Sequence, residues 1–291
     1  MSTATIPHRS VPATAPTNHG YKLSFLGVLR SEWMKFWSLR SSWIVVPLTY
    51  ILAVGPSIAL TYALRNEIGT GKELLDTIYS LLSLSAGLSG LIVIAYSVTI
   101  VTNEWSTGSI YSTVTAVPRR TPTFFAKLIV SSFITILVHT LAYLTILANL
   151  SYIGDTGSFW SDKDTWLLML IQIVGILFYS VLATFIAYLL RNTALSMVIL
   201  YAFVTVVQSI LTVLALQFEW MRNIVKVLPS SLVQAINEFV ISSAEQAPPG
   251  GDSSIPVPDL TLSANWSAFT MVIWVVFFGV LAWVTLKRRD I

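Results

Sequence analysis

The chain has 291 residues, of which 55% are hydrophobic and only 11% are charged, and its formal net charge is +3. Soluble domains carry about 25% charged residues, so this composition excludes an ordinary soluble domain and indicates a protein of the lipid bilayer. The small net charge argues against nucleic acid as a partner, and the absence of cysteine excludes disulfides, thiolate metal sites and cysteine nucleophiles.

Two segments precede the first long apolar run. Residues 1–20 are polar and proline-rich and lack the apolar core of a signal peptide, which predicts a disordered cytoplasmic tail. Residues 21–43 are predicted to form a basic amphipathic helix in the membrane interface, an elbow that anchors the first span or also frames a cytoplasmic partner. Its most informative aromatic and basic residues are Trp33, Lys35, Trp37 and Arg40.

Six apolar runs follow, each near the length of about 20 residues that crosses a hydrocarbon core. They predict an all-α membrane protein in which residues 44–291 form a domain of six transmembrane helices. The runs cover residues 44–64, 81–101, 128–150, 166–190, 194–216 and 269–286. Between the last two, residues 217–268 are predicted to be extracellular and to contain short helices on both sides of Pro229.

The lysines and arginines are distributed unevenly over the connecting segments. With the N-terminus inside the cell, most of them fall inside, and the positive-inside rule therefore places both termini in the cytoplasm. The inner set is Arg9, Lys22, Arg30, Lys35, Arg40, Arg119, Arg120, Lys127, Arg191, Lys287, Arg288 and Arg289. The outer set is Arg65, Lys72, Lys163, Arg222 and Lys226.

The chain shows no energy source of its own. The six predicted spans contain no Asp, Glu, Lys or Arg, which argues against coupling to protons or sodium. The nearest match to a phosphate-binding loop, GTGKE at residues 69–73, lacks the required first glycine and the Ser or Thr after the lysine. If this protein moves a solute uphill, another chain must supply the work by gripping a cytoplasmic loop.

The cytoplasmic segment TNEWSTGSI at residues 102–110 is unusually polar for this chain. We expect Thr102 or Asn103 to cap a short helix and Glu104 to lie in its first turn, near the positive end of the helix dipole. Gly108 would permit a bend or the close approach of another backbone. The simpler alternative is that Glu104 serves only as a capping residue.

Three segments give the chain a family resemblance. They are SEWMKFWSLRSSW at residues 31–43, NEWSTGSI at 103–110 followed by AVPRR at 116–120, and KVLPSSL at 226–232. With the six-span plan they resemble an ABC-2-type permease, the membrane subunit of a bacterial ATP-binding cassette exporter. The resemblance implies that the loop after the second span couples to an ATPase through Glu104, Trp105, Thr107, Gly108, Arg119 and Arg120. The alternative for the two arginines is that they only follow the positive-inside rule.

The resemblance also implies the partners and the setting. The chain would be a transport subunit in the bacterial cell membrane, without an enzymatic activity, cofactor or metal of its own. Two copies of an ATPase subunit would bind ATP and Mg²⁺, and a second permease copy or a related permease would complete the path within membrane lipid. An uncharged, aromatic interior favours export of an amphiphile such as a drug, peptide antibiotic or lipid, with a polysaccharide or glycolipid as the alternative.

A few residues within the spans carry more specific expectations. Three polar side chains form interhelical hydrogen bonds or line the translocation path: His139, Gln172 and Gln208. A kink in the first span and close packing of the second are expected at Gly55, Pro56, Gly87 and Gly90.

Two other classes of protein compete with the transporter. Residues 87–90, Gly-Leu-Ser-Gly, match the G-x-S-G of rhomboid-type intramembrane serine proteases, and at 1.5 Å per residue Ser89 and His139 lie at similar depths of about 13 and 16 Å. The order of the two residues among the helices differs from the rhomboid pattern. A passive channel is the remaining alternative.

Overall fold

The computed structural model describes residues 24–66, 68, 72–110, 120–154, 158–243 and 260–288. Within these ranges the regular structure is helical, and six helices are long and apolar enough to cross a membrane. The predicted all-α class with six candidate spans is therefore confirmed. The spans are α2 (Arg40–Leu64), α3 (Lys72–Ser106), α5 (Arg120–Gly154), α6 (Lys163–Leu190), the stretch Thr193–Gln217 and α11 (Ala264–Arg288).

Helices α3 and α5 are longer than a membrane requires. Each has 35 residues, which corresponds to about 52 Å against a hydrocarbon core of about 30 Å. The apolar runs at 81–101 and 128–150 occupy only their middle parts. Both helices therefore extend polar ends beyond the apolar layer.

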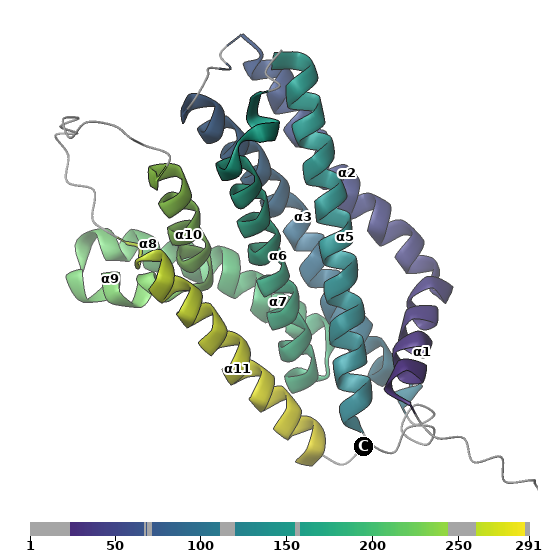
Figure 1. Ribbon diagram of the computed structural model, residues 1–291. Coiled ribbons are helices and arrows are strands. Elements are labelled where there is room, and N and C mark those ends of the chain that lie inside the picture. Colours follow the sequence, from purple (N-terminus) through teal and green to yellow (C-terminus); the bar gives the residue numbers. More distant parts are fainter. Residues whose placement is uncertain are drawn as a thin grey trace, which may run out of the picture.

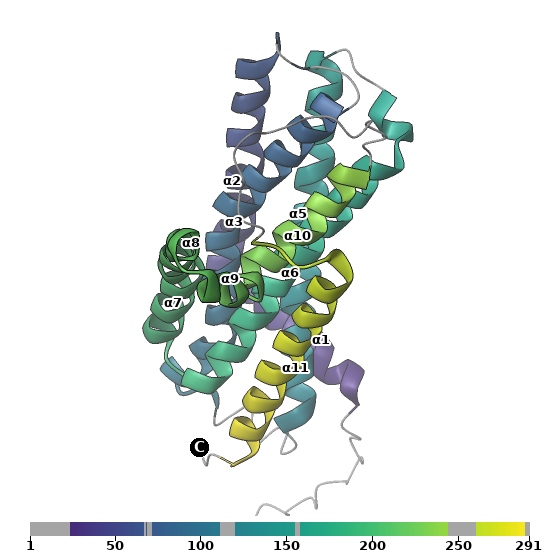
Figure 2. The same cartoon turned by 90° about the vertical axis from the view of Figure 1, so that its left-hand side faces the viewer.

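Helix α6 is the centre of the bundle (Figures 1 and 2). It contacts α3, α5 and α11, and 61% of its most apolar window is buried inside the protein. Its sequence is apolar on every side, as expected for a helix surrounded by others. Helix α2 packs against α3 and α5 on one side of this centre, and α11 lies on the other.

The lower end of the bundle in Figure 1 gathers α1 (Phe25–Ser38), the end of α3, the start of α5 and the end of α11. Helix α1 begins where Ser24 Oγ accepts a hydrogen bond from Gly27 N at 3.1 Å, and it is separated from α2 by Leu39 alone. Helix α1 lies within the range of 21–43 predicted for an amphipathic helix, of which residues 21–23 lie outside the described residues. Its buried residues are Val28, Glu32 and Phe36, which lie one turn apart on one face.

Two short helices, α9 (Glu219–Lys226) and α10 (Pro229–Ser243), lie where short helices are predicted. They are bent by 80° at the break before Pro229, and α10 packs against α6 and α11. Trp274 of α11 donates its indole N–H to the Val227 carbonyl oxygen at 3.0 Å and so holds this break against the bundle.

The fifth span is irregular. It consists of α7 (Thr193–Tyr201), the π-helix η2 (Ala202–Val207) and α8 (Gln208–Gln217). Helix α7 packs on α3 and α6, whereas α8 packs on α9. Only 11% of the most apolar window of this span is buried, so most of its apolar surface faces outward.

Candidate functional site

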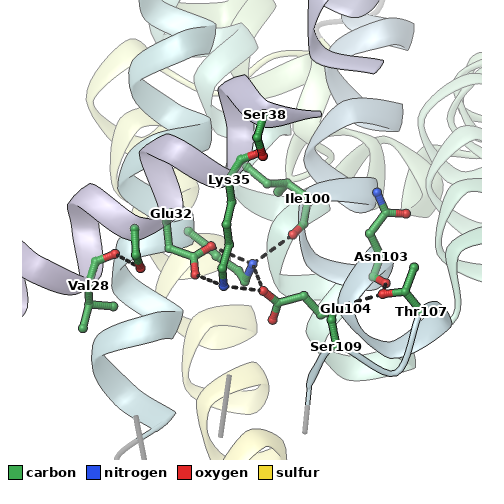
Figure 3. Close-up of polar contacts among 11 residues, drawn as sticks. Val28, Glu32, Lys35, Ser38, Ile100, Asn103, Glu104, Thr107 and Ser109 are labelled. Atoms are coloured by element: carbon green, nitrogen blue, oxygen red, sulfur yellow. Dashed lines mark hydrogen bonds and ion pairs between the residues drawn. The ribbon is translucent and has the colours of Figure 1, made fainter. Parts of the chain in front are cut away.

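Four charged side chains meet inside the lower end of the bundle (Figure 3). The ammonium nitrogen of Lys35 lies 2.7 Å from Glu32 Oε1 and 2.9 Å from Glu104 Oε1. That of Lys127 lies 2.8 Å from Glu32 Oε2 and 3.0 Å from Glu104 Oε1. Each lysine contacts both carboxylates, so the charges alternate around a closed ring that we call the charge cluster.

The charge cluster is built from three helices, α1, α3 and α5. Glu32 lies between Val28 and Phe36 on the buried face of α1. Glu104 lies in the last turn of α3, and Lys127 about two turns into α5. Because α3 and α5 extend past the apolar layer, their charged residues meet α1 there.

The charge cluster is electrically balanced and largely buried. The side chains of Glu32 and Lys127 are 2% and 3% exposed, whereas that of Lys35 is 43% exposed. Burial opposes a charge on Lys35, but the hydrogen bonds and the attraction of Glu32 and Glu104 outweigh it and raise the pKa of the Lys35 ammonium. Lys127 also donates to the Ile100 carbonyl oxygen at 3.2 Å. Among the described residues, the buried Glu104 Oε2 accepts no hydrogen bond.

A hollow opens beside the charge cluster. It has a volume of about 280 Å³, and besides all four cluster residues it is lined by Ser38, Leu39, Asn103, Thr107 and Ser109. A second hollow of about 340 Å³ adjoins it between α2 and α3, and the two share Phe36, Leu39, Ile100 and Asn103. The charge cluster therefore borders an open space between α1 and the end of α3.

The predicted start of a short helix at residues 102–104 is wrong. Thr102, Asn103 and Glu104 belong to the last turns of α3, which continues to Ser106. The chain turns away just after the helix at Gly108, whose φ of +70° suits glycine, and Thr107 N donates to the Asn103 carbonyl oxygen at 3.0 Å. The physical reason is that the apolar pattern of α3 continues through Val101 without a helix-breaking residue. Glu104 therefore lies near the negative end of a helix and is stabilised by lysines instead.

Three other residues predicted to couple to an ATPase, Trp105, Thr107 and Gly108, lie at the end of α3. Trp105 packs edge-to-face on Tyr188 at 5.8 Å, and the guanidinium of Arg191 lies 5.5 Å from the Trp105 ring centroid. Thr107 and Gly108 are exposed. Arg119 lies outside the described residues, and of Arg120 only the backbone is described, as the first residue of α5.

The aromatic residues predicted to belong to an elbow helix form a layer next to the charge cluster. Trp33 packs edge-to-face on Trp37 at 5.8 Å and on Phe133 of α5 at 5.6 Å. Trp43 donates its indole N–H to the Trp37 carbonyl oxygen at 3.0 Å, which stabilises the corner between α1 and α2. Arg40, the first residue of α2, is exposed.

The polar residues of the spans have different surroundings. Gln172 of α6 donates from Nε2 to Ser83 Oγ of α3 at 2.8 Å, an interhelical hydrogen bond. Gln208 is 4% exposed, and neither atom of its amide group has a hydrogen-bond partner among the described residues. This amide directly follows the π-helix η2.

Ser89 and His139 are brought together by the packing of α3 against α5. Ser89 Oγ lies 2.9 Å from His139 Nε2, a contact typical of a serine nucleophile and its base. Both side chains are fully buried, and the void beside His139 measures about 10 Å³, enough for one water. Ser89 is also in the middle of α3, where the backbone N–H groups are used by the helix and cannot form an oxyanion hole. This site does not admit a peptide.

The small residues of the first two spans differ in their contacts. A Cβ at Gly90 would lie 3.1 Å from Ile176 Cδ1 of α6, so this glycine allows close packing of α3 and α6. At Gly87 and Gly55 a Cβ would meet no atom within 4 Å. Helix α2 is continuous through Pro47 and Pro56.

Sequence reasoning missed two members of the charge cluster, Glu32 and Lys127. One signal could have found Glu32. Glu32 repeats at four-residue spacing with Val28 and Phe36, and it is one of very few carboxylates at a strongly basic end, where it has to pair with a cation. Its partner Lys127 is 95 positions away in the sequence, so no local sequence pattern predicts this contact.

The described residues contain no group of three or more His, Cys, Asp or Glu side chains suited to a metal ion. The sequence matches no protein-family model and no curated protein at a significant level.

Proposed function

We propose that this chain is the permease subunit of an ATP-binding cassette exporter of the ABC-2 type, and that the lower end in Figure 1 is its cytoplasmic end. The observation that carries the proposal is the charge cluster. It ties Glu104, the carboxylate of the E-x-x-x-G segment, to the elbow helix through Lys35 and to α5 through Lys127. A force applied to the segment after α3 is therefore passed directly to α1 and α5.

The distribution of charge supports this orientation. The lower end carries Arg30, Lys35 and Lys127 with Lys287 and Arg288 at the end of α11, whereas the described residues of the spans themselves lack lysine and arginine in their apolar runs. Basic residues of this kind remain on the cytoplasmic side of membranes. Both termini would then be cytoplasmic.

In the proposed mechanism the work comes from another chain. Two ATPase subunits bind ATP and Mg²⁺ and draw together, and a helix or loop of each one enters the hollow beside the charge cluster. Because the elbow helix, α3 and α5 are joined there, this movement shifts the balance between two arrangements of the membrane helices. A second permease copy, or a related permease, completes the path.

The proposed cargo is an amphiphile such as a drug, peptide antibiotic or lipid. A groove of about 290 Å³ between α6, the fifth span and α11 supports this choice, because apolar and aromatic side chains line it, among them Phe203, Trp274 and Phe278. Such a lining offers hydrophobic contacts to an apolar chain or ring and little to a polysaccharide.

The first experiment is co-purification. We expect the tagged chain, extracted with mild detergent from its native membrane, to bring down an ATP-binding cassette subunit in near-equal amount. Thr107→Trp, an exposed change in the hollow, should reduce that amount several-fold at unchanged yield. Ser80→Trp, an exposed change near the other end of α3, is the matched control. If no such subunit is recovered in any of several mild detergents, the proposal fails.

A further inference from the structure

The second hollow, with a volume of about 340 Å³, differs from the one at the charge cluster in its lining. It lies between residues 41–48 of α2 and residues 92–103 of α3, and Phe36 and Leu39 border it from the end of α1 and the corner after it. We call it the α2–α3 hollow. Its volume is within the range of about 300–1,000 Å³ that is typical of small-molecule sites.

Small side chains leave this space open. Ala95 and Thr99 lie one turn apart on the face of α3 that borders the hollow, and Ser42 borders it from α2. Toward the other end of the two helices they are in direct contact, where Ser57 Oγ donates to the Leu81 carbonyl oxygen at 3.0 Å. The pair is therefore closely packed at Ser57 and open at the α2–α3 hollow.

Helix α1 keeps the hollow from closing. Phe36 of α1 is 2% exposed and packs edge-to-face on Tyr96 of α3 at 5.6 Å. The corner between α1 and α2 is stabilised by the hydrogen bond from Trp43 to the Trp37 carbonyl oxygen. Because α2 starts from this fixed corner, moving it onto α3 would require the displacement of a buried aromatic pair.

Two polar side chains at the hollow lack hydrogen bonds inside the protein. The Tyr96 hydroxyl is buried, and no described residue is its hydrogen-bond partner. The side-chain amide of Asn103 lies where the α2–α3 hollow meets the hollow at the charge cluster, and Figure 3 shows no hydrogen bond from it to the residues drawn. Burial of a hydroxyl without a partner is unfavourable, so a molecule that supplies the partner recovers this free energy.

The lining also determines which charge an occupant can carry. Among the described residues no Asp, Glu, Lys or Arg borders the α2–α3 hollow, so a charged group inside it would be buried without a counter-ion. The four charges of the neighbouring charge cluster already pair with one another. The hollow therefore suits an uncharged molecule that is mainly apolar and carries a hydrogen-bond acceptor.

We propose that the α2–α3 hollow is a binding site for an uncharged amphiphile. Its apolar chain or ring lies between α2 and α3, and one of its oxygen atoms, a carbonyl or ether oxygen, accepts a hydrogen bond from the Tyr96 hydroxyl. Its polar head contacts the Asn103 amide at the border with the charge cluster. Ala95 and Thr99 provide the room for this molecule on the α3 side.

The hollow is accessible from outside the bundle. Ser41 and Leu48 at its rim are exposed, whereas Ser42 and Tyr96 at its inner wall are buried. It is also separate from the apolar groove that contains Trp274, because the residues of that groove come from α6, the fifth span, Pro229 and α11. The two spaces lie on opposite sides of the central helix α6.

The test uses a photoreactive probe, a glycerol ester of dodecanoic acid with a diazirine in the middle of its alkyl chain. The full-length protein is placed in lipid bilayers and irradiated with the probe, and labelled peptides are identified by mass spectrometry. We expect saturable labelling of residues 41–48 and 92–103. Labelling that rises linearly with probe concentration and is spread over all the outward-facing helices would show partition into the bilayer only and would overturn the proposal.

Competition tests the preference for an uncharged head. Unlabelled dodecanoyl glycerol should displace the probe, whereas dodecyl phosphate and dodecyltrimethylammonium, which carry charged heads on an alkyl chain of the same length, should be at least about tenfold weaker competitors. Equal displacement by all three compounds would refute the argument from the uncharged lining.

Two variants test the position of the site. Ala95→Trp fills the hollow and should abolish saturable labelling, and Leu88→Trp, an exposed change two turns away on α3, is the matched control. Tyr96→Phe keeps the ring that packs on Phe36 but removes the hydroxyl, so half-saturation should require about three- to tenfold more probe, as the loss of one hydrogen bond implies.

The unfolding midpoint distinguishes binding from a purely structural effect. Without probe, Tyr96→Phe should have an unchanged or higher midpoint, because it removes a buried hydroxyl that has no partner among the described residues. With probe, its gain in midpoint should be smaller than that of the wild type. Unchanged probe affinity in Tyr96→Phe would refute the hydrogen bond, and wild-type labelling of Ala95→Trp would refute the site. None of these outcomes depends on whether an ATPase binds the chain.

Discussion

Lys127 is the most informative residue to change, because it is the buried cation of the charge cluster. Lys127→Met removes the contacts at 2.8 Å and 3.0 Å to Glu32 and Glu104 and leaves two buried carboxylates with Lys35 alone. Removing one partner of a buried pair costs about 3–5 kcal/mol of folding free energy. Lys35→Met should cost only about 1 kcal/mol or less, since the side chain of Lys35 is 43% exposed and solvent screens its charge.

The midpoint of thermal unfolding in detergent, followed by loss of monodisperse protein, measures both changes. We expect a clearly larger decrease for Lys127→Met than for Lys35→Met at equal detergent and protein concentration. Equal decreases, or a larger one for Lys35→Met, would refute the reasoning from burial.

A charge exchange distinguishes a ring from an isolated pair. The double variant Glu32→Lys, Lys127→Glu keeps the pair between α1 and α5 but places like charges beside Lys35 and Glu104. A simple pair would be rescued by this exchange, whereas alternating charges predict that the double variant is no more stable than Lys127→Met. Recovery of the wild-type midpoint would contradict the closed ring.

The remaining predictions use the same stability assay. Gly90→Val should lower the unfolding midpoint more than Gly87→Val, because a Cβ at Gly90 would lie 3.1 Å from Ile176 Cδ1 of α6 and one at Gly87 would meet no atom within 4 Å. Gln172→Leu should destabilise by about 1 kcal/mol through a lost interhelical hydrogen bond, and Gln208→Leu should stabilise because its buried amide has no partner among the described residues. The contribution of Lys35 to the free energy of unfolding should be fully present below its ordinary pKa near 10.5 and should disappear as the pH rises through its raised pKa. The unfolding midpoints of the wild type and Lys35→Met should therefore converge in strong alkali.

The number and position of the spans could be predicted because the length of an apolar run is a direct consequence of membrane thickness. The runs at 81–101 and 128–150 lie inside α3 and α5. The ends of these helices could not be predicted, because hydropathy no longer applies beyond the apolar layer. There the end of α3 depends on one backbone angle, the positive φ of Gly108.

The candidate site could be predicted only in part. Glu104 and Lys35 are charged residues in the two segments that carry the family resemblance, so both could be singled out from the sequence. Their contact could not be predicted, because they are 69 positions apart. Lys127 contributes to the positive-inside count whether or not it is buried, so its presence in the sequence gives no hint of its two carboxylate partners. The depth estimate put Ser89 and His139 at similar heights in the membrane, which is compatible with their contact at 2.9 Å but does not by itself predict it.

The π-helix η2 in the fifth span lies between two helices that contact different parts of the bundle. A wide turn holds more than the usual 3.6 residues, so one added residue rotates everything after it by about 100° relative to everything before it. The face of α7 that contacts α3 and α6 therefore does not fix which face of α8 contacts α9. Deleting a single residue from Ala202–Val207 would shorten the span by little, yet it would turn the Gln208 amide away from its buried position and present a different set of side chains to α9.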